Sequence, residues 1–360
     1  MCKIAEMKRP PLLCALMPLL LAAAPASPSK PATPAPSPGE IVAAAPAGDW
    51  VAIAPSDLLV MDLASPARGP GQASAQDKAR RVVIQLMSPP FSQGWIGNIR
   101  KLAAAQWWDG TSVNRVQDNY VVQWGDVTEK KALPVGLVTV GETEYSFPII
   151  WREIPREENE IITSHGSYEL EPSVSHVRGS DPFAGFTGFL AGWPLAGLEH
   201  GTKGLSSLLR KPLSSRDGRP VMAWPVHCYG MVGVGRNLSP DTGSGAELYT
   251  VIGHAPRHLD RNIALVGRVI EGIEHLSSLP RGTEALGFYK TAEERVTIKS
   301  IRIASEMKSD PTFRFEYLST ESASFAKYAD ARANRRDPFF IKPAGGADIC
   351  NIPMPVRRIR

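Results

Sequence analysis

The residues that best suit the chemistry of a binding or catalytic site are Arg115 and Gln123, which lie eight positions apart. A guanidinium is always charged, rigid and rich in hydrogen-bond donors, and an amide both donates and accepts. The two residues fall in strand-like runs at 111–116 and 120–124, so a three-residue loop at 118–120 would place them opposite each other on one face. The spacing by itself favours a plainer interpretation, a surface arginine and a solvated glutamine on a strand.

A second candidate is Asp241-Thr242-Gly243-Ser244, which has the signature of an aspartic protease. In such enzymes two carboxylates at tight turns share a proton. The motif occurs once, and residues 237–240 precede it where an apolar strand would be expected. We therefore interpret it as a turn.

A third candidate is a metal site made of His227, Cys228, His254 and His258. A His-x3-His spacing can place two imidazoles on one helical face. Pro256 stands between the last two histidines and favours a loop, so we predict no metal and no cofactor. The sequence also lacks a Walker-type phosphate loop and a G-x-S-x-G nucleophile elbow.

The elements that must position these residues are mainly short strands. Apolar spacing predicts helices at about 94–106 and 271–279. Strand patterns occur at 81–87, 111–116, 120–124, 230–235, 246–252, 263–269 and 295–304. Many short strands with two helices predict an all-β barrel or sandwich, and a doubly wound sheet is not indicated.

The segment 108–126 resembles the cyclophilin-type peptidyl-prolyl cis-trans isomerases. In that family a strand pair carries a catalytic arginine, a glutamine eight residues later and a Gly-Asp ending, here Arg115, Gln123 and Gly125-Asp126. A second set of segments matches the family in order and approximate spacing: 230–235, 243–252, 259–260 and 266–272. The resemblance covers roughly 80–126 and 228–304 and leaves 127–225 and the tail unexplained.

The resemblance implies an eight-stranded closed barrel with two capping helices, interrupted by an insert. It also implies rotation of X-Pro bonds in proline-containing polypeptide chains, with Arg115 as the catalytic donor and Gln123 holding the substrate backbone. The alternative is a weakly active or non-catalytic module of the same fold that binds proline segments as a chaperone.

The resemblance further implies an apolar proline pocket with walls at Tyr120, Val121, Tyr249 and Leu259, although Val121 and Leu259 could equally be ordinary barrel packing. It adds four substrate-binding positions: Asn114, Gly235, Glu247 and His258. The chain departs from the family at several of these positions: Asn114 and Ile263 replace usual histidines, Glu247 a usual glutamine, His258 a usual tryptophan and Val121 a common methionine. We expect these changes to alter rate and sequence preference.

The N-terminal residues have the pattern of a secretory signal peptide: Lys8-Arg9, an apolar run and a small-residue site around Ala24-Pro25-Ala26. The run is too short for a stable membrane span, with an uncleaved anchor as the alternative. Composition divides the chain into a signal peptide (1–26), a Pro/Ala-rich extended linker (27–48), a barrel domain (49–304) with an insert at about 127–225, and a C-terminal extension (305–360).

Export would leave two cysteines, Cys228 and Cys350. They can form one disulfide in an oxidising compartment or remain two buried thiols, and the sequence leaves both open. The net charge of +4, from 40 Lys and Arg against 36 Asp and Glu, is not gathered into basic runs, so no nucleic-acid partner is predicted. We expect a periplasmic or secreted monomer.

Overall fold

The computed structural model describes residues 34–65, 80–151, 169–170, 181–198, 219–307 and 313–359. Residues 35–360 form one compact unit, to which all the described helices and strands belong. The predicted signal peptide lies outside the described residues. Among the residues described, no helix has the length and apolar character needed to cross a bilayer.

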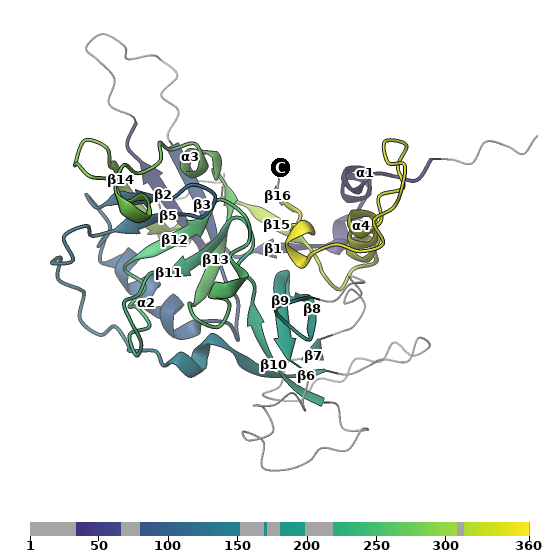
Figure 1. The fold of residues 1–360 in the computed structure, drawn as a ribbon, viewed down its shortest axis with the longest axis horizontal. Helices are drawn as coiled ribbons and strands as arrows, with labels where there is room; N and C mark the ends of the chain where they lie inside the picture. The colour runs from purple at the N-terminus through teal and green to yellow at the C-terminus, as the bar shows by residue number, and fades with distance from the viewer. Residues whose placement is uncertain are drawn as a thin grey trace, which may run out of the picture. The chain divides into compact units, whose positions relative to one another are not determined.

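An eight-stranded closed antiparallel barrel forms the centre of the fold, which confirms the predicted class (Figure 1). The barrel order is β11-β12-β5-β4-β14-β2-β3-β13, and β13 pairs with β11 to close it. The strands are β2 (Leu58–Leu63), β3 (Arg80–Leu86), β4 (Ser112–Val116), β5 (Val121–Gly125), β11 (Met231–Val234), β12 (Leu248–Val251), β13 (Leu265–Glu271) and β14 (Val296–Ile303).

Two helices accompany the barrel, and the first matches its sequence pattern closely. α2 (Gln93–Ala104) packs Trp95, Ile96 and Ile99 into the main core. α3 (Glu274–Ser277) is shorter than predicted, because β13 continues to Glu271. Gly272 then turns the chain at φ 83°, where a Cβ would lie 2.1 Å from the Arg81 carbonyl oxygen, so the helix begins only after that turn.

Residue alternation along β5 and β12 separates two faces. Val122, Trp124 and Leu248 point into the main barrel core. Their neighbours Val121 and Tyr249 belong to a separate small apolar cluster. Because successive side chains of a strand point to opposite sides, this second set lies on the outer face of the barrel.

The insert at 127–225 contributes a second sheet of order β7-β6-β10-β9-β8. Its strands are β6 (Phe147–Trp151), β7 (Glu169–Leu170), β8 (Phe186–Leu190), β9 (Trp193–Leu198) and β10 (Arg219–Pro225). The glycine-rich and aromatic residues 183–193 contribute β8, the turn at Ala191 and Gly192, and the first residue of β9. Trp193 and Leu195 from this sheet join the main core, so the insert packs as part of the folded unit.

The C-terminal extension forms a third sheet with a strand that precedes the barrel. β1 (Trp50–Ile53), β15 (Phe315–Leu318) and β16 (Val356–Arg358) pair in the order β1-β15-β16. A disulfide of S–S length 2.05 Å joins Cys228, just before β11, to Cys350 in the extension. The extension is thus held by strand pairing to β1, which precedes the barrel, and by a disulfide to the residues just before β11.

The predicted linker at 27–48 is wrong from Pro38 onward. Residues Pro38–Ala43 form α1, which packs against α4 (Ala323–Ala333) of the extension. The Ser37 hydroxyl accepts a hydrogen bond from the Glu40 N–H, and the Glu40 carboxylate accepts one from the Ser37 N–H. This capping box, together with proline at the first helical position, starts a helix in a segment whose composition is typical of an extended chain.

Candidate functional site

Arg115, Gln123, Tyr249 and Gly233 form one row across four neighbouring barrel strands. Arg115 on β4 pairs with Gln123 on β5, Gln123 pairs with Tyr249 on β12, and Tyr249 pairs with Gly233 on β11. Directly opposite residues of antiparallel strands point to the same side, so the row lies on the outer face. The Gln117 N–H donates to the Val121 carbonyl and closes the expected 118–120 loop, which fixes this register.

The guanidinium of Arg115 is oriented by three acceptors. Nε donates to the Leu286 carbonyl at 2.7 Å and Nη1 donates to Gln123 Oε1 at 3.2 Å. Nη2 donates to Gln117 Oε1. Since a guanidinium has five N–H groups, two remain without an acceptor among the residues described.

Aromatic rings flank Arg115 in place of carboxylates. The guanidinium carbon lies 5.7 Å from the centre of the Tyr120 ring and 5.3 Å from that of Phe288. Partial burial lowers the pKa of Arg115 from its usual value, and within the described chain no carboxylate forms an ion pair with it. The cation is therefore fixed in place while its charge stays uncompensated.

An outer apolar cluster borders this arginine. Val121, Tyr249 and Val251 are its buried members, and Tyr120 and Ile263 pack against them. The structure thus brings together three of the four predicted pocket walls. The fourth, Leu259, is half-buried in the 3-10 turn η5 (Arg257–Leu259) and is not part of this cluster.

The exposed His258 also belongs to η5 and lies over the half-buried Tyr120, with ring centres 6.2 Å apart and planes 10° apart. The predicted substrate-binding residue His258 therefore borders the apolar cluster from its solvent side.

A polar cavity of about 500 Å³ adjoins Gln123 on the side away from the cluster. Asn114, Gly235 and Glu247 line it, so three further predicted positions meet there. A Cβ on Gly235 would lie 2.9 Å from the Cβ of Glu247, which explains why glycine is needed at this close approach.

Burial raises the pKa of Glu247 to about 7. Hydrogen bonds from the Asp126 N–H and from the side chains of Asn114 and Gln123 lower the pKa in part, and the Asp126 charge raises it. Because the hydrogen bond with Gln123 favours the anion, the Gln123 amide nitrogen is its donor. This orientation leaves Gln123 Oε1 to accept from Arg115.

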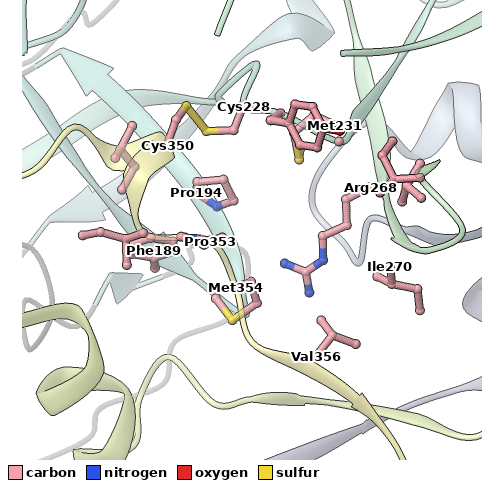
Figure 2. A pocket seen from close by; sticks show the side chains of 16 residues that line it. Phe189, Pro194, Cys228, Met231, Arg268, Ile270, Cys350, Pro353, Met354 and Val356 are labelled. Atoms are coloured by element: carbon pink, nitrogen blue, oxygen red, sulfur yellow. A yellow bond between two sulfur atoms is a disulfide. The ribbon is translucent and has the colours of Figure 1, made fainter. Parts of the chain in front are cut away.

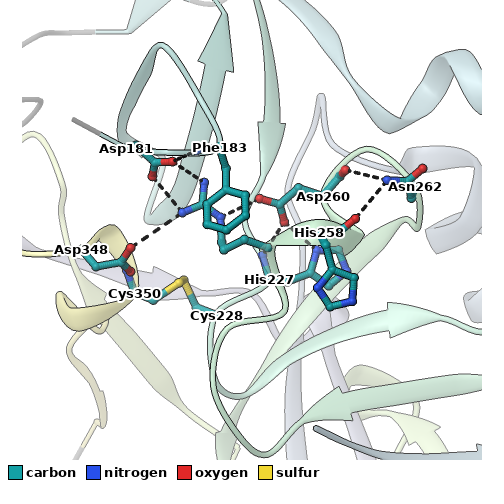
Figure 3. Close-up of polar contacts among 10 residues, drawn as sticks. Asp181, Phe183, His227, Cys228, His258, Asp260, Asn262, Asp348 and Cys350 are labelled. Carbon is teal, nitrogen blue, oxygen red and sulfur yellow. Dashed lines mark hydrogen bonds and ion pairs between the residues drawn. A yellow bond between two sulfur atoms is a disulfide. The ribbon is translucent and has the colours of Figure 1, made fainter.

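The Tyr249 hydroxyl contacts a buried polar network, of which Figure 3 shows His227 and Asp260. The Tyr249 hydroxyl lies 2.7 Å from His227 Nε2, and His227 Nδ1 lies 2.8 Å from Asp260 Oδ1. Burial lowers the pKa of His227. Burial would raise the pKa of Asp260, but hydrogen bonds from His227 and Arg257 lower it. A neutral His227 therefore donates a hydrogen bond through Nδ1 to an ionised Asp260 and accepts one from the Tyr249 O–H through Nε2.

Arg257 extends this network into the insert. Its Nε donates to Asp260 Oδ2 at 2.7 Å and its Nη1 donates to Asp181 Oδ2 at 2.8 Å. An ion pair of 3.8 Å reaches Asp348 of the C-terminal extension. Burial alone would lower the pKa of Arg257, but hydrogen bonds to Asp181 and Asp260 raise it.

The network from Tyr249 to Asp181 was not predicted from the sequence. His227 and Asp260 are 33 positions apart and Arg257 and Asp181 are 76 apart, so no local spacing pairs them. Leu286 and Phe288, which contact Arg115, were also not predicted. Their loop lies far from β4 in the sequence, and only the pairing of that loop with β4 brings them to Arg115.

The two rival sites are not assembled. Asp241 accepts hydrogen bonds from the N–H groups of Asn237 and Gly243, as a turn residue does. His227 lies in the buried network and Cys228 in the disulfide. Within the described residues no cluster of three or more His, Cys, Asp or Glu could hold a metal.

Comparison with known proteins gives a family and a fold. The family described as "Cyclophilin type peptidyl-prolyl cis-trans isomerase/CLD" matches residues 94–305. The crystal structure of cyclophilin AquaCyp293 from Hirschia baltica is similar, with a TM-score of 0.56 and 19% identity over 86% of this chain and 92% of that chain. At this identity the likeness shows a shared fold.

A second solved structure, a cyclophilin type peptidyl-prolyl cis-trans isomerase of Cryptosporidium parvum in the presence of the dipeptide Ala-Pro, has a TM-score of 0.31. It is 11% identical over 64% of this chain and 94% of that chain. No curated protein matches the chain.

Proposed function

The chain belongs to the cyclophilin-type peptidyl-prolyl cis-trans isomerase family, and on this basis we propose that it catalyses rotation about X-Pro bonds in polypeptide substrates. The observation that carries the proposal is the pairing of Arg115 with Gln123 beside an outer apolar cluster. Arg115 is partly buried there and has no carboxylate partner among the described residues. A donor next to an apolar surface is what this reaction requires.

The reaction needs neither a nucleophile nor a proton transfer. An uncatalysed X-Pro bond crosses a barrier of about 18–20 kcal/mol in tens to hundreds of seconds. The twisted transition state has lost amide resonance, so the proline nitrogen becomes pyramidal and basic. A donor aimed at that nitrogen stabilises the transition state more than the planar ground state.

We assign that donation to Arg115. Three of its N–H groups are held by Leu286, Gln123 and Gln117, so the two remaining ones are presented in a fixed direction. The absence of a paired carboxylate within the described residues keeps the full positive charge available. A preorganised donor of this kind adds no reorganisation cost during the twist.

We assign reception of the proline ring to Tyr120, Val121, Tyr249 and Ile263. An apolar wall removes water from the imide, and desolvation favours the less charge-separated twisted state. Gln123 lies between this wall and the polar cavity, where it is positioned to bind a substrate backbone group. Asn114, Gly235 and Glu247 would receive the neighbouring substrate residue in that cavity.

We further propose that the protein acts on exported chains in a periplasmic or secreted location. The signal-peptide pattern at 1–26 supports this location. The Cys228–Cys350 disulfide supports it independently, because structural disulfides persist in oxidising compartments.

The function is tested by NMR exchange spectroscopy on an Ala-Pro-containing peptide with the full chain, with Arg115→Ala and with Arg336→Ala. Arg336 is the control, because it is an exposed arginine paired with Asp330 in the extension. We expect catalysed exchange with the parent protein and with Arg336→Ala, and a strong loss with Arg115→Ala. Peptide binding without exchange in the parent protein would contradict catalysis and support the chaperone alternative.

A further inference from the structure

A second cavity, of about 290 Å³, is lined by none of the residues assigned to the reaction. Met231 and Arg268 of the barrel, Pro194 of the insert, and Met354 and Val356 of the extension contribute to its walls. The disulfide lies at one end of the lining (Figure 2), and the exposed Tyr229 also belongs to the lining. The cavity is thus built where all three sheets meet.

Arg268 is the charged group of this cavity. It pairs with Met231 on one side and Gln85 on the other, so it lies in an outer-face row of the barrel. It is only 7% exposed because the insert and the extension cover this row. Figure 2 shows its guanidinium pointing into the space bordered by Met354, Ile270 and Val356.

The contacts of Arg268 are all to neutral groups. Nε and Nη2 donate to Gln85 Oε1 at 3.0 and 2.6 Å, and Nη1 donates to the Gly192 carbonyl at 2.6 Å. The rings of Trp193 and Tyr317 lie 4.4 and 5.8 Å from the guanidinium carbon. Two of the five N–H groups have no acceptor in the part of the chain that the structure describes.

A buried cation without a counter-charge is costly, and proteins normally pair it. The nearby Arg257 shows the usual solution, with two buried carboxylates in hydrogen-bond contact. Arg268 has none among the residues described, and burial lowers its pKa to about 9. The missing partner is therefore an anion, and the open space beside the guanidinium is where it would lie.

We propose that this cavity is a binding site for a small monocarboxylate with an aliphatic chain, whose head group pairs with Arg268. The methionine, isoleucine, valine and proline walls suit a hydrocarbon chain, and the two free N–H groups suit a carboxylate. A space of about 290 Å³ corresponds to about ten water-sized groups, which matches a head group and a chain of about six to eight carbons.

Isothermal titration calorimetry of the full chain with sodium octanoate tests the site, with octan-1-ol as the neutral ligand of the same chain length. The variants are Arg268→Met, which removes the charge and keeps an apolar stem, and Met354→Trp, which fills the cavity and leaves Arg268 in place. Arg302→Met is the matched control, a barrel arginine that is paired with Asp109 at 2.6 Å and does not line the cavity. Near-UV circular dichroism checks the fold of each variant.

We expect one octanoate per chain, at least tenfold weaker binding of octanol, at least tenfold loss in Arg268→Met and in Met354→Trp, and unchanged binding in Arg302→Met. Arg115→Ala should bind octanoate as the parent protein does, so the two sites are tested separately. Equal binding of octanol, no octanoate binding at millimolar concentration, or unchanged binding in a folded Arg268→Met would each overturn the proposal. If Arg268→Met does not fold, unchanged binding in Met354→Trp overturns it.

Discussion

Arg115 and Arg257 occupy two regions of the barrel that the fold treats in opposite ways. Arg257 is surrounded by Asp181 and Asp260, and their hydrogen bonds raise its pKa. Arg115 has carbonyl, amide and aromatic neighbours, and burial lowers its pKa. An arginine is thus fully paired with carboxylates where it joins the barrel to the insert. The other arginine keeps free N–H donors where we place the substrate.

The different partners of the two arginines correspond to a structural role for Arg257 and a catalytic role for Arg115. A network of paired charges stabilises one arrangement of the chain, but its cation is already neutralised and does not attract a ligand. An oriented cation without a counter-ion can respond to charge that develops on a substrate. Tyr249 connects the two regions, because its ring lies in the apolar cluster and its hydroxyl contacts His227.

The largest effect on stability is expected from Arg257→Leu. This change leaves Asp181 and Asp260 buried without their cation, and breaking a buried pair from one side costs about 3–5 kcal/mol. Denaturant unfolding of this variant and of Arg115→Ala measures the contrast. The comparison fails if Arg115→Ala loses as much free energy of unfolding as Arg257→Leu.

The next effect is expected from removing the disulfide in a Cys228→Ala, Cys350→Ala double variant. The bond closes a segment with a sequence separation of 122, and loss of such a constraint costs about 2–4 kcal/mol. The stability loss should leave X-Pro exchange within about twofold at a temperature where the variant is folded. Identical denaturation midpoints with and without the bond would show that strand pairing alone holds the extension.

The protonation of Glu247 is expected to make the free energy of unfolding depend on pH, by no more than the loss expected from removing the disulfide. Its pKa in the folded protein is raised to about 7 from a usual 4.5, so the folded state binds the proton more tightly than the unfolded state. The free energy of unfolding should therefore fall as pH rises from about 4.5 to about 7 and change no further above that. Urea unfolding across this pH range should show a smaller fall in the free energy of unfolding for Glu247→Gln than for the parent protein. An equal dependence on pH in both proteins would contradict the raised pKa of Glu247.

The smallest stability effect is expected from Tyr249→Phe. The change keeps the ring in the apolar cluster and removes the partner of His227 Nε2, which costs about 1–3 kcal/mol for a buried unpaired group. The catalysed exchange rate of the X-Pro peptide should stay within about twofold of that of the parent protein. A large loss of exchange with little loss of stability would place the hydroxyl itself in the site.

The short strands and the central row were predictable because their signals are local, whereas the closed eight-stranded barrel was implied by the family resemblance. The spacing of Arg115 and Gln123 around a short loop fixes their pairing, and the apolar periodicity of α2 fixes its buried face. The sheet of the insert was not predictable as a whole, since β10 pairs with β6 from far earlier in the chain. The helix at Pro38–Ala43 was missed because proline composition outweighed a capping box in the interpretation.

The site was predictable only in part. Family resemblance located Arg115, Gln123, Tyr120, Val121 and Tyr249, and the structure has these in one neighbourhood. Ile263, which stands where the family usually has a histidine, packs against the apolar cluster, whereas the predicted wall residue Leu259 in η5 is not part of it. The Arg257–Asp260 pair is local, at a spacing of three residues, but the contact with Asp181 depends on the fold of the insert and has no local sequence signal.

The central claim, that Arg115 selectively stabilises the twisted X-Pro bond, is tested most directly by exchange spectroscopy at saturating peptide. Under this condition the exchange rate reports on catalysis, and a parallel titration reports the Kd. Loss of one charge-assisted hydrogen bond of about 1.5–3 kcal/mol predicts a rate about 10- to 150-fold lower in Arg115→Ala, with Kd changed only a few-fold. An unchanged exchange rate at saturation, or a loss that appears only in Kd, would contradict it.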